Sequence, residues 1–206
     1  MSSGVVASSS RATDLSDRCF RRILLVKPSS LGDVVHALPV LHGLRLRYPE
    51  AHLAWLVATP FAPLLADHPE LDEVITFDRR RFGALAKRAS VAADFARFLV
   101  DLRGRRFDLV LDLQGLFRSG FLAWATGASV RIGFRDAREA ARLFYTHVIR
   151  VDDREAHAVD RNYRVARLLG FSDVPVEFTG AVSPTAREQA RRLLDSAGDT
   201  NERPVI

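Results

Sequence analysis

Short apolar runs alternate with segments of helical periodicity along most of the chain. The runs are continuous in Val, Ile and Leu rather than interleaved with polar residues, which is typical of parallel strands buried on both faces. Strands are predicted over residues 21–27, 52–58, 72–77, 107–114, 128–134 and 147–151. The pattern predicts an α/β fold with a doubly wound, mostly parallel, Rossmann-like sheet and right-handed connections.

The segments between these runs predict helices. Val34, Leu38, Leu41 and Leu44 recur at helical spacing, and Pro39 should kink or shorten that helix. Further helices are predicted over residues 61–69, 79–105, 115–127 and 156–170. The segment 79–105 is expected to form one long basic amphipathic helix or a helix pair.

The two ends of the chain differ from this core. Residues 1–20 are polar and rich in Ser, without the features of a signal peptide, so we expect a disordered leader on a cytoplasmic protein. Residues 21–182 are expected to form one domain. Residues 183–206 contain a predicted helix at 184–198 and end on an apolar stretch that resembles the start of another strand. We expect a linker helix there and the beginning of a truncated second domain.

Composition narrows the class of protein. Of the 206 residues, 48% are apolar, which excludes disorder for most of the chain. Cys19 is the single cysteine, so neither a disulfide framework nor a cysteine zinc site is expected. No apolar run reaches the roughly 18 residues that cross a bilayer. Among the 30 basic residues only Lys27 and Lys87 are lysines. The many arginines suit an anionic partner, although a GC-rich genome explains them equally well.

The loop after the first predicted strand is the first candidate for chemistry. Ligands of open α/β sheets bind at the carboxyl ends of the strands, and Lys27-Pro28-Ser29-Ser30-Leu31-Gly32-Asp33 lies there. This segment matches neither a Walker A loop nor a GxGxxG fingerprint, so ATPase and NAD-binding functions lose their main support. Asp33 is also a favoured helix N-cap, and His36 lies one helical turn further on.

Two more segments follow strand ends. Asp112 to Ser119 offers Gln114 and Arg118 for sugar hydroxyls or an anion, and Asp112 could pair with Asp33 as a second carboxylate. Arg79, Arg80 and Arg81 follow the third predicted strand and suit phosphate, although a solvated basic face explains them equally well. No nucleic-acid-binding motif accompanies the arginines. The histidines lack metal-ligand spacing and no GxSxG elbow occurs, so neither a metal site nor a serine hydrolase is predicted.

Four ordered segments resemble a known family. ILLVKPSSLGDVVHALPVL, DLQGLFRSG, GFRDAREAARLFYTHVI and HAVDRNY resemble stretches of the lipopolysaccharide heptosyltransferases, glycosyltransferase family 9. The match is closest to the N-terminal half of the heptosyltransferase I group, with Arg118 where lysine is usual. The resemblance implies a GT-B enzyme whose N-terminal half binds the acceptor and whose C-terminal half binds most of the nucleotide-sugar. Residues 21–182 would then be the acceptor-binding domain.

The resemblance also implies a reaction. It is an inverting, metal-independent and cofactor-free transfer of heptose from ADP-heptose to Kdo of the lipid A inner core, in lipopolysaccharide biosynthesis. Asp33 is the implied general base. The expected substrate-binding residues are Lys27, Ser29, Ser30, Gly32, Arg79, Arg80, Arg81, Gln114, Arg118, Arg138 and His157. We expect peripheral contact with the inner face of the cytoplasmic membrane and no nucleic-acid partner. We also expect the 206 residues alone to be inactive, because the main donor site belongs to the other half.

Other functions stay open at this point. The nearest is another family 9 activity, such as that of heptosyltransferase II. A different class is a non-catalytic Rossmann-like module that binds an anionic glycolipid. A nucleic-acid binder is third, and it would show steeply salt-dependent binding.

Overall fold

The computed structural model describes residues 14–78, 89–151, 157–180 and 184–196. The strands are β1 (Arg22–Val26), β2 (His52–Ala58), β3 (Glu73–Phe77), β4 (Leu109–Asp112), β5 (Val130–Phe134) and β6 (His147–Ile149). The α-helices are α1 (Leu31–Val35), α2 (Leu38–Arg47), α4 (Ala89–Gly104), α5 (Phe117–Ala125), α6 (Ala158–Tyr163), α7 (Val165–Leu169) and α8 (Pro184–Ser196). The described residues also contain two short 3-10 helices, η1 (Thr59–Leu64) and η2 (Ala141–Phe144).

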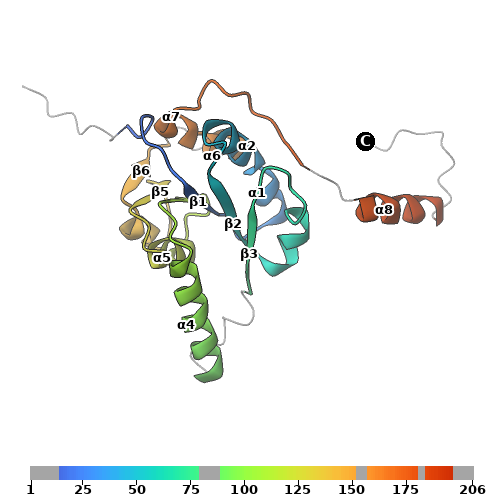
Figure 1. Cartoon of the computed structure of the whole chain (residues 1–206), viewed down its shortest axis with the longest axis horizontal. Coiled ribbons are helices and arrows are strands. Elements are labelled where there is room, and N and C mark those ends of the chain that lie inside the picture. The colour runs from blue at the N-terminus through green and yellow to red at the C-terminus, as the bar shows by residue number, and fades with distance from the viewer. Residues whose placement is uncertain (1–13, 79–88, 152–156, 181–183, 197–206) are drawn as a thin grey trace, which may run out of the picture.

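The strands form one parallel sheet in the order β3-β2-β1-β4-β5-β6. The chain winds outward from β1 to β3, then crosses back and winds outward from β4 to β6 (Figure 1). The predicted α/β, Rossmann-like class is confirmed. The order reverses between β1 and β4, where Val26 is paired with Asp112. Crevices for ligands lie at such reversals, because the loops leaving the two strands turn to opposite faces.

Alternate strand residues supply two separate cores. Ile23 and Leu25 of β1 face a core that includes residues of α1, α2 and α7. Leu24 and Val26 face a second core that includes residues of α4 and α5. Both faces of the sheet are therefore covered, which explains why its strands are continuously apolar in sequence.

Several helix bounds differ from the sequence prediction. The segment around Pro39 forms two helices rather than one kinked helix, with Pro39 in the first turn of α2. Proline suits that turn because its missing N–H would have no helical partner there. Residues 59–64 form 3-10 helix η1 instead of an α-helix at 61–69. The predicted helix at 156–170 divides into α6 and α7 at Arg164. Helix η2 was not predicted.

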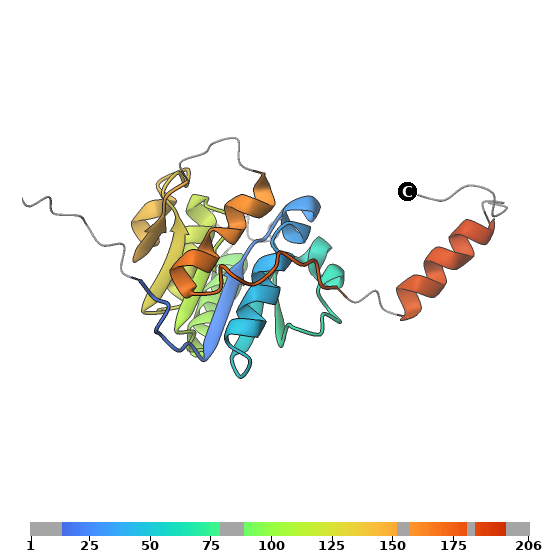
Figure 2. The ribbon, with the colours of Figure 1, turned by 90° about the horizontal axis from the view of Figure 1, so that it is seen from above.

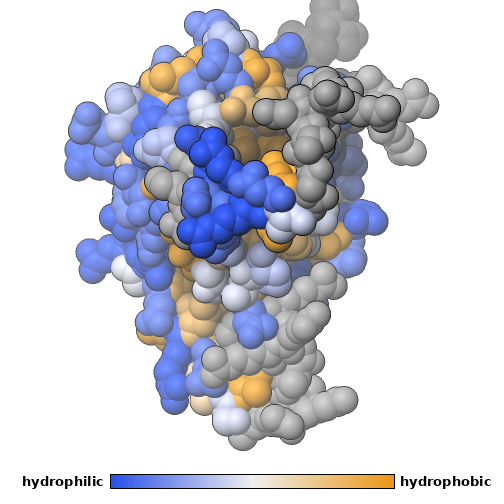
Figure 3. All heavy atoms as spheres, turned by 90° about the vertical axis from the view of Figure 1, so that its right-hand side faces the viewer, coloured by the Kyte–Doolittle hydropathy of each residue, from blue (hydrophilic) through white to orange (hydrophobic). Residues whose placement is uncertain are grey.

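The ends of the chain also refine the prediction. Within the expected leader, residues 14–20 pack on the domain: Leu15 and Phe20 are buried, and the Leu15 N–H donates to the Leu168 carbonyl at 3.1 Å. Residues 1–13 lie outside the described residues. Helix α8 stands apart from the sheet and its covering helices (Figure 2). Hydrophilic residues dominate the face of the molecule on that side, with smaller hydrophobic areas between them (Figure 3).

The segment that leaves α7 follows a fixed path across the domain toward α8. The Tyr163 hydroxyl donates to the Val174 carbonyl at 2.6 Å. Further along, the Thr179 hydroxyl donates to Glu70 at 2.7 Å, and Nε2 of the buried His68 lies 2.8 Å from the Thr179 carbonyl oxygen. These hydrogen bonds therefore hold residues 171–180 against the domain.

Candidate functional site

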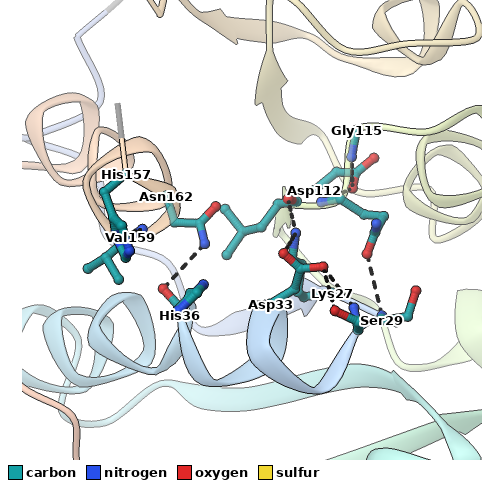
Figure 4. A network of polar contacts seen from close by, with 12 residues as sticks. Lys27, Ser29, Asp33, His36, Asp112, Gly115, His157, Val159 and Asn162 are labelled. Carbon is teal, nitrogen blue, oxygen red and sulfur yellow. Dashed lines mark hydrogen bonds and ion pairs between the residues drawn. The ribbon is translucent and has the colours of Figure 1, made fainter. Parts of the chain in front are cut away.

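The loops that follow β1 and β4 meet at the reversal of strand order. Lys27 to Ser30 leave β1, and Leu113 to Leu116 leave β4. The Ser29 N–H donates to Gln114 Oε1 at 3.4 Å, and Lys27 Nζ donates to the Leu113 carbonyl at 3.0 Å. The structure thus brings together the two loops that the sequence singled out separately (Figure 4).

Asp33 lies in the first turn of α1 and bonds back to the residue before the helix. Its Oδ2 accepts from the Ser30 backbone N–H at 2.8 Å and from the Ser30 hydroxyl at 3.1 Å. Its Oδ1 faces Lys27 Nζ at 3.8 Å, beyond hydrogen-bond distance. The side chain is 40% exposed. Oδ2 therefore caps the helix, while Oδ1 has lone pairs that can accept a proton from a bound molecule.

The surroundings of Asp33 favour its ionised form. Partial burial raises the pKa of this carboxyl, but the hydrogen bonds from Ser30 and the positive charge of Lys27 outweigh it. The net pKa lies below the usual range of aspartate. At neutral pH the group is a carboxylate that can accept a proton.

Lys27 is buried directly behind this carboxylate. Only 6% of the residue is exposed, and burial lowers the pKa of its ammonium group, opposed by the negative charge of Asp33. Its ammonium group holds the Leu113 carbonyl, so Lys27 ties the end of β4 to the start of α1. Lys27 is therefore a buried positive charge next to the crevice rather than a group exposed in it.

The remaining residues of the first loop shape the opening. Ser30 and Gly32 are exposed and Ser29 is half-buried. A Cβ placed on Gly32 would meet nothing within 4 Å. Glycine is therefore not required there by packing against the protein, and the backbone beside Asp33 is open to a bound molecule.

Asp112 is not the second carboxylate of a solvent-facing pair. It is 0% exposed and accepts four hydrogen bonds: the N–H groups of Gln114 and Gly115 donate to Oδ1, and the hydroxyls of Ser119 and Tyr145 donate to Oδ2 at 2.8 and 2.6 Å. Burial raises its pKa, and these four donors oppose that effect. Asp112 holds the loop that carries Gln114 and does not reach the crevice.

Arg118 and Arg138 come to neighbouring positions from separate segments. Arg118 lies in the first turn of α5, and the backbone N–H of Arg138 donates to the Gly115 carbonyl at 2.9 Å. Both residues are exposed. The structure thus supports grouping these arginines beside the β4 loop. Arg79, Arg80 and Arg81 lie outside the described residues.

His157 approaches the crevice from α6. Its ring centroid lies 5.1 Å from that of His36, and its Nδ1 accepts the Val159 N–H at 3.3 Å as an N-cap. The Asn162 side-chain amide donates to the His36 carbonyl at 3.3 Å, which joins α6 to the end of α1. The expected site residue His157 is therefore next to the first loop, with one ring nitrogen committed to the cap.

Two residues near the site were missed by reasoning from the sequence. Arg161 packs over the Phe134 ring at 4.0 Å, binds Asp136 at 2.9 Å and is close enough to lower the pKa of Lys27. Tyr145 supplies a donor to Asp112 from beyond β5. The segments containing both residues resemble the family, but nothing in their spacing indicated which side chains face the site.

The arrangement suits acid–base chemistry next to an anion. It offers one ionised carboxylate, exposed backbone and hydroxyl groups, and arginines at the rim. Among the described residues, no group of three or more His, Cys, Asp and Glu side chains is placed to hold a metal ion. Within the same part of the chain, no helix has the length and apolar character that crossing a membrane requires.

Comparisons with known proteins agree with this architecture. The profile of glycosyltransferase family 9 (heptosyltransferase) matches residues 95–206. Lipopolysaccharide heptosyltransferase 1 of Escherichia coli strain RS218 is 34% identical over 155 residues, covering 73% of this chain and 47% of that protein. Lipopolysaccharide heptosyltransferase 1 of Pseudomonas aeruginosa is 38% identical over 143 residues, covering 68% and 40%.

A solved structure gives the same relationship. E. coli heptosyltransferase WaaC with ADP-2-deoxy-2-fluoro heptose has a TM-score of 0.67 and 32% identity, covering 76% of this chain and 51% of that one. This chain spans about half the length of the relatives it matches. The family profile covers more than half of the chain and includes the loop after β4. The chain belongs to glycosyltransferase family 9.

Proposed function

We propose that this chain supplies the acceptor-binding half of an inverting, metal-independent heptosyltransferase. The enzyme moves heptose from ADP-heptose to a Kdo residue of the lipid A inner core. The observation that carries the proposal is Asp33: an ionised, partly exposed carboxylate at the reversal of strand order in a family 9 chain. The relatives are heptosyltransferases by name, and two of them are lipopolysaccharide heptosyltransferase 1.

The proposed step assigns one task to Asp33. Its Oδ1 accepts the proton of the acceptor hydroxyl while that oxygen attacks the anomeric carbon of the heptose. The bond from the anomeric carbon to the diphosphate oxygen breaks on the opposite face, and ADP leaves with the bonding electrons. Configuration at the anomeric carbon is therefore inverted. Ser30 keeps Oδ2 engaged, so Oδ1 is the oxygen available to the hydroxyl.

The acceptor is anionic, and the rim of the site is cationic. Arg118 and Arg138 would bind the carboxylate of Kdo or nearby phosphates, with Arg161 behind them. Gln114, Ser29, Ser30 and His157 would bind sugar hydroxyls, and Gly32 would leave room for the sugar. Arg79, Arg80 and Arg81 remain proposed contacts from the sequence. The donor would be bound mainly by the C-terminal half of the enzyme, and membrane contact would be peripheral.

The decisive experiment replaces Asp33 with Asn in an enzyme that carries both halves. Asn keeps an oxygen for the Ser30 bonds, so the fold is expected to persist while kcat falls by about 10²–10⁴-fold. The control is Asp101→Asn, because Asp101 is exposed on α4, away from the site. Near-normal turnover of Asp33→Asn would remove Asp33 as the base.

Acceptor choice is tested on the same enzyme. Transfer to Kdo-lipid A identifies heptosyltransferase I chemistry, whereas transfer only to an acceptor that already carries heptose identifies another family 9 activity. Binding of the acceptor without any transfer would favour the non-catalytic module.

A further inference from the structure

An aromatic face lies on the surface along α5 and η2. We define it as Phe117, Phe121 and Trp124 of α5 together with Leu143 and Phe144 of η2. The ring of Phe144 lies 5.3 Å from Phe117, 6.2 Å from Phe121 and 6.5 Å from Trp124, measured between centroids. Despite this packing, Phe117 is 50% exposed, Trp124 53% and Leu143 84%.

The face is built into the fold. Phe117, Phe121 and Trp124 recur along one side of α5, while Leu122 and Ala123 on the other side are buried in the core. Gly120 lets η2 approach closely, because a Cβ there would lie 2.9 Å from the Phe144 ring and 3.0 Å from the Ala141 carbonyl oxygen. Helix α4 also packs on α5, and the Phe95 ring stacks on that of Phe121 at 6.4 Å.

The segment that carries these apolar side chains, residues 117–144, is also rich in arginine. Its exposed arginines are Arg118, Arg135, Arg138 and Arg142. Residues 117–144 contain five arginines and two carboxylates. Asp136 binds Arg161 at 2.9 Å, and the exposed Glu139 accepts the Phe117 N–H at 3.3 Å. Exposed aromatic and leucine side chains bordered by arginines match the interface of an anionic bilayer, where rings sit at headgroup depth and basic groups meet lipid phosphates.

The face is also continuous with the candidate site. Phe117 follows the β4 loop directly, and the backbone of Arg138 is bonded to Gly115 of that loop. A bilayer in contact with the face would therefore lie beside the mouth of the crevice.

We propose that the aromatic face of α5 and η2 docks on an anionic lipid bilayer. Phe117, Trp124 and Leu143 insert among the headgroups, and the neighbouring arginines bind lipid phosphates. Lipid binding by this face needs no transfer reaction. Docking would help catalysis by delivering a lipid-anchored acceptor to Asp33. This benefit rests on the proposed function.

The first test mixes the chain of residues 1–206 with phosphatidylcholine vesicles, with and without phosphatidylglycerol. We expect flotation with the anionic vesicles, a blue shift of tryptophan emission and quenching by lipids with brominated acyl chains. The chain has two tryptophans, and Trp55 is 0% exposed, so the signal reports Trp124. Trp124→Phe should retain binding and lose the shift.

The second test compares matched variants. Trp124→Ser combined with Leu143→Ser should weaken binding to the anionic vesicles by about tenfold or more. Arg142→Ala should weaken it about fivefold. The control is Leu46→Ser, because Leu46 is 55% exposed on α2, which covers the opposite face of the sheet. Thermal melts establish that the variants are folded. Leu143→Ser is also tested alone, because Leu143 is the most exposed side chain of the face.

Three results with vesicles would each overturn the proposal. They are no binding to anionic vesicles, equal binding by the aromatic variants and Leu46→Ser, and an unshifted Trp124 in vesicle-bound protein. Aromatic variants that change only the molar mass in solution would identify a protein interface and also overturn it. Lipid binding without heptose transfer in the two-half enzyme would contradict the proposed function and leave the docking face standing.

Discussion

Asp33 and Lys27 form a coupled pair at the residue scale. Their closest charged atoms are 3.8 Å apart, with the ammonium group buried and the carboxylate partly exposed. The lowered pKa of Asp33 means that this group stabilises the fold above its unfolded pKa. That contribution is lost as pH falls through the lower folded pKa. Around neutral pH the carboxylate is therefore both stabilising and ready to accept a proton.

Lys27→Met should raise the pKa of Asp33 toward its usual value. The substitution removes the nearby positive charge and leaves the Ser30 hydrogen bonds in place. An NMR titration of the Asp33 carboxyl carbon measures the change. An unaltered Asp33 titration would show that Lys27 does not set its charge state.

Tyr145→Phe should destabilise the fold by about 1–3 kcal/mol, because it removes one of the four donors to a buried carboxylate. Burial raises the folded pKa of Asp112, so its ionisation weakens the fold as pH rises through that pKa. The loss in Tyr145→Phe should therefore be larger at neutral pH than in acid. Urea unfolding at several pH values checks this, and a loss that does not vary with pH would speak against an ionised Asp112.

At the scale of elements, close packing at glycines sets how helices meet their neighbours. A Cβ on Gly43 of α2 would lie 2.5 Å from the ring of Phe171, which is 1% exposed, so the ring or the helix would have to shift. Phe171 follows α7, and its ring also packs edge-on against Tyr163 at 5.8 Å. This contact fixes α2 against the segment that leaves α7.

Gly43→Ala should cost about 1–3 kcal/mol of unfolding free energy through overpacking. Gly104→Ala is the matched control, since a Cβ there meets nothing within 4 Å at the end of α4. The control should be neutral or stabilise by about 0.4–1 kcal/mol. Chemical denaturation of both variants tests the pair. Recovery of stability on adding Phe171→Leu to Gly43→Ala would identify the ring as the cause.

At the scale of the whole molecule, the position of the site follows from the order of the strands. Placing β1 beside β4 brings Lys27 and Asp33 to Leu113 and Gln114, which are distant in sequence. The exposed Arg118 and Arg138 then lie beside the loop that follows β4. In the proposed enzyme this half presents the acceptor, and the donor comes from the second half.

The protein of residues 1–206 alone should therefore transfer no heptose. A radiolabelled ADP-heptose assay with Kdo-lipid A measures this, with an enzyme carrying both halves as the positive control. Reproducible transfer by residues 1–206, lost on Asp33→Asn, would place a working donor site within them.

The amino-acid sequence by itself determined the fold class and the two loops of the site. Continuous apolar runs predict strands that are buried on both faces of a sheet. Ligands of such sheets bind at the carboxyl ends of the strands, so the candidate loops can be located from the sequence. The local pattern indicated Asp33 as a helix N-cap, but the N-cap is Ser30 and Asp33 lies three residues further on. Only the resemblance to the family implied Asp33 as a general base. The pattern predicted one helix that Pro39 kinks or shortens, whereas α1 ends at Val35 and α2 begins at Leu38. Local pattern does not distinguish a bend from a new helix.

Only the tertiary structure decided which polar side chains are exposed to a ligand and which are buried. Asp112 resembled an exposed partner of Asp33 and is instead buried beneath four donors, one of them Tyr145 from 33 residues away. Lys27 was expected among the substrate-binding residues, and the structure shows it buried next to the Asp33 carboxylate. The aromatic face likewise exists only where η2 packs on α5. Burial and long-range hydrogen bonds depend on how strands are ordered and helices packed, and periodicity along the chain does not encode either.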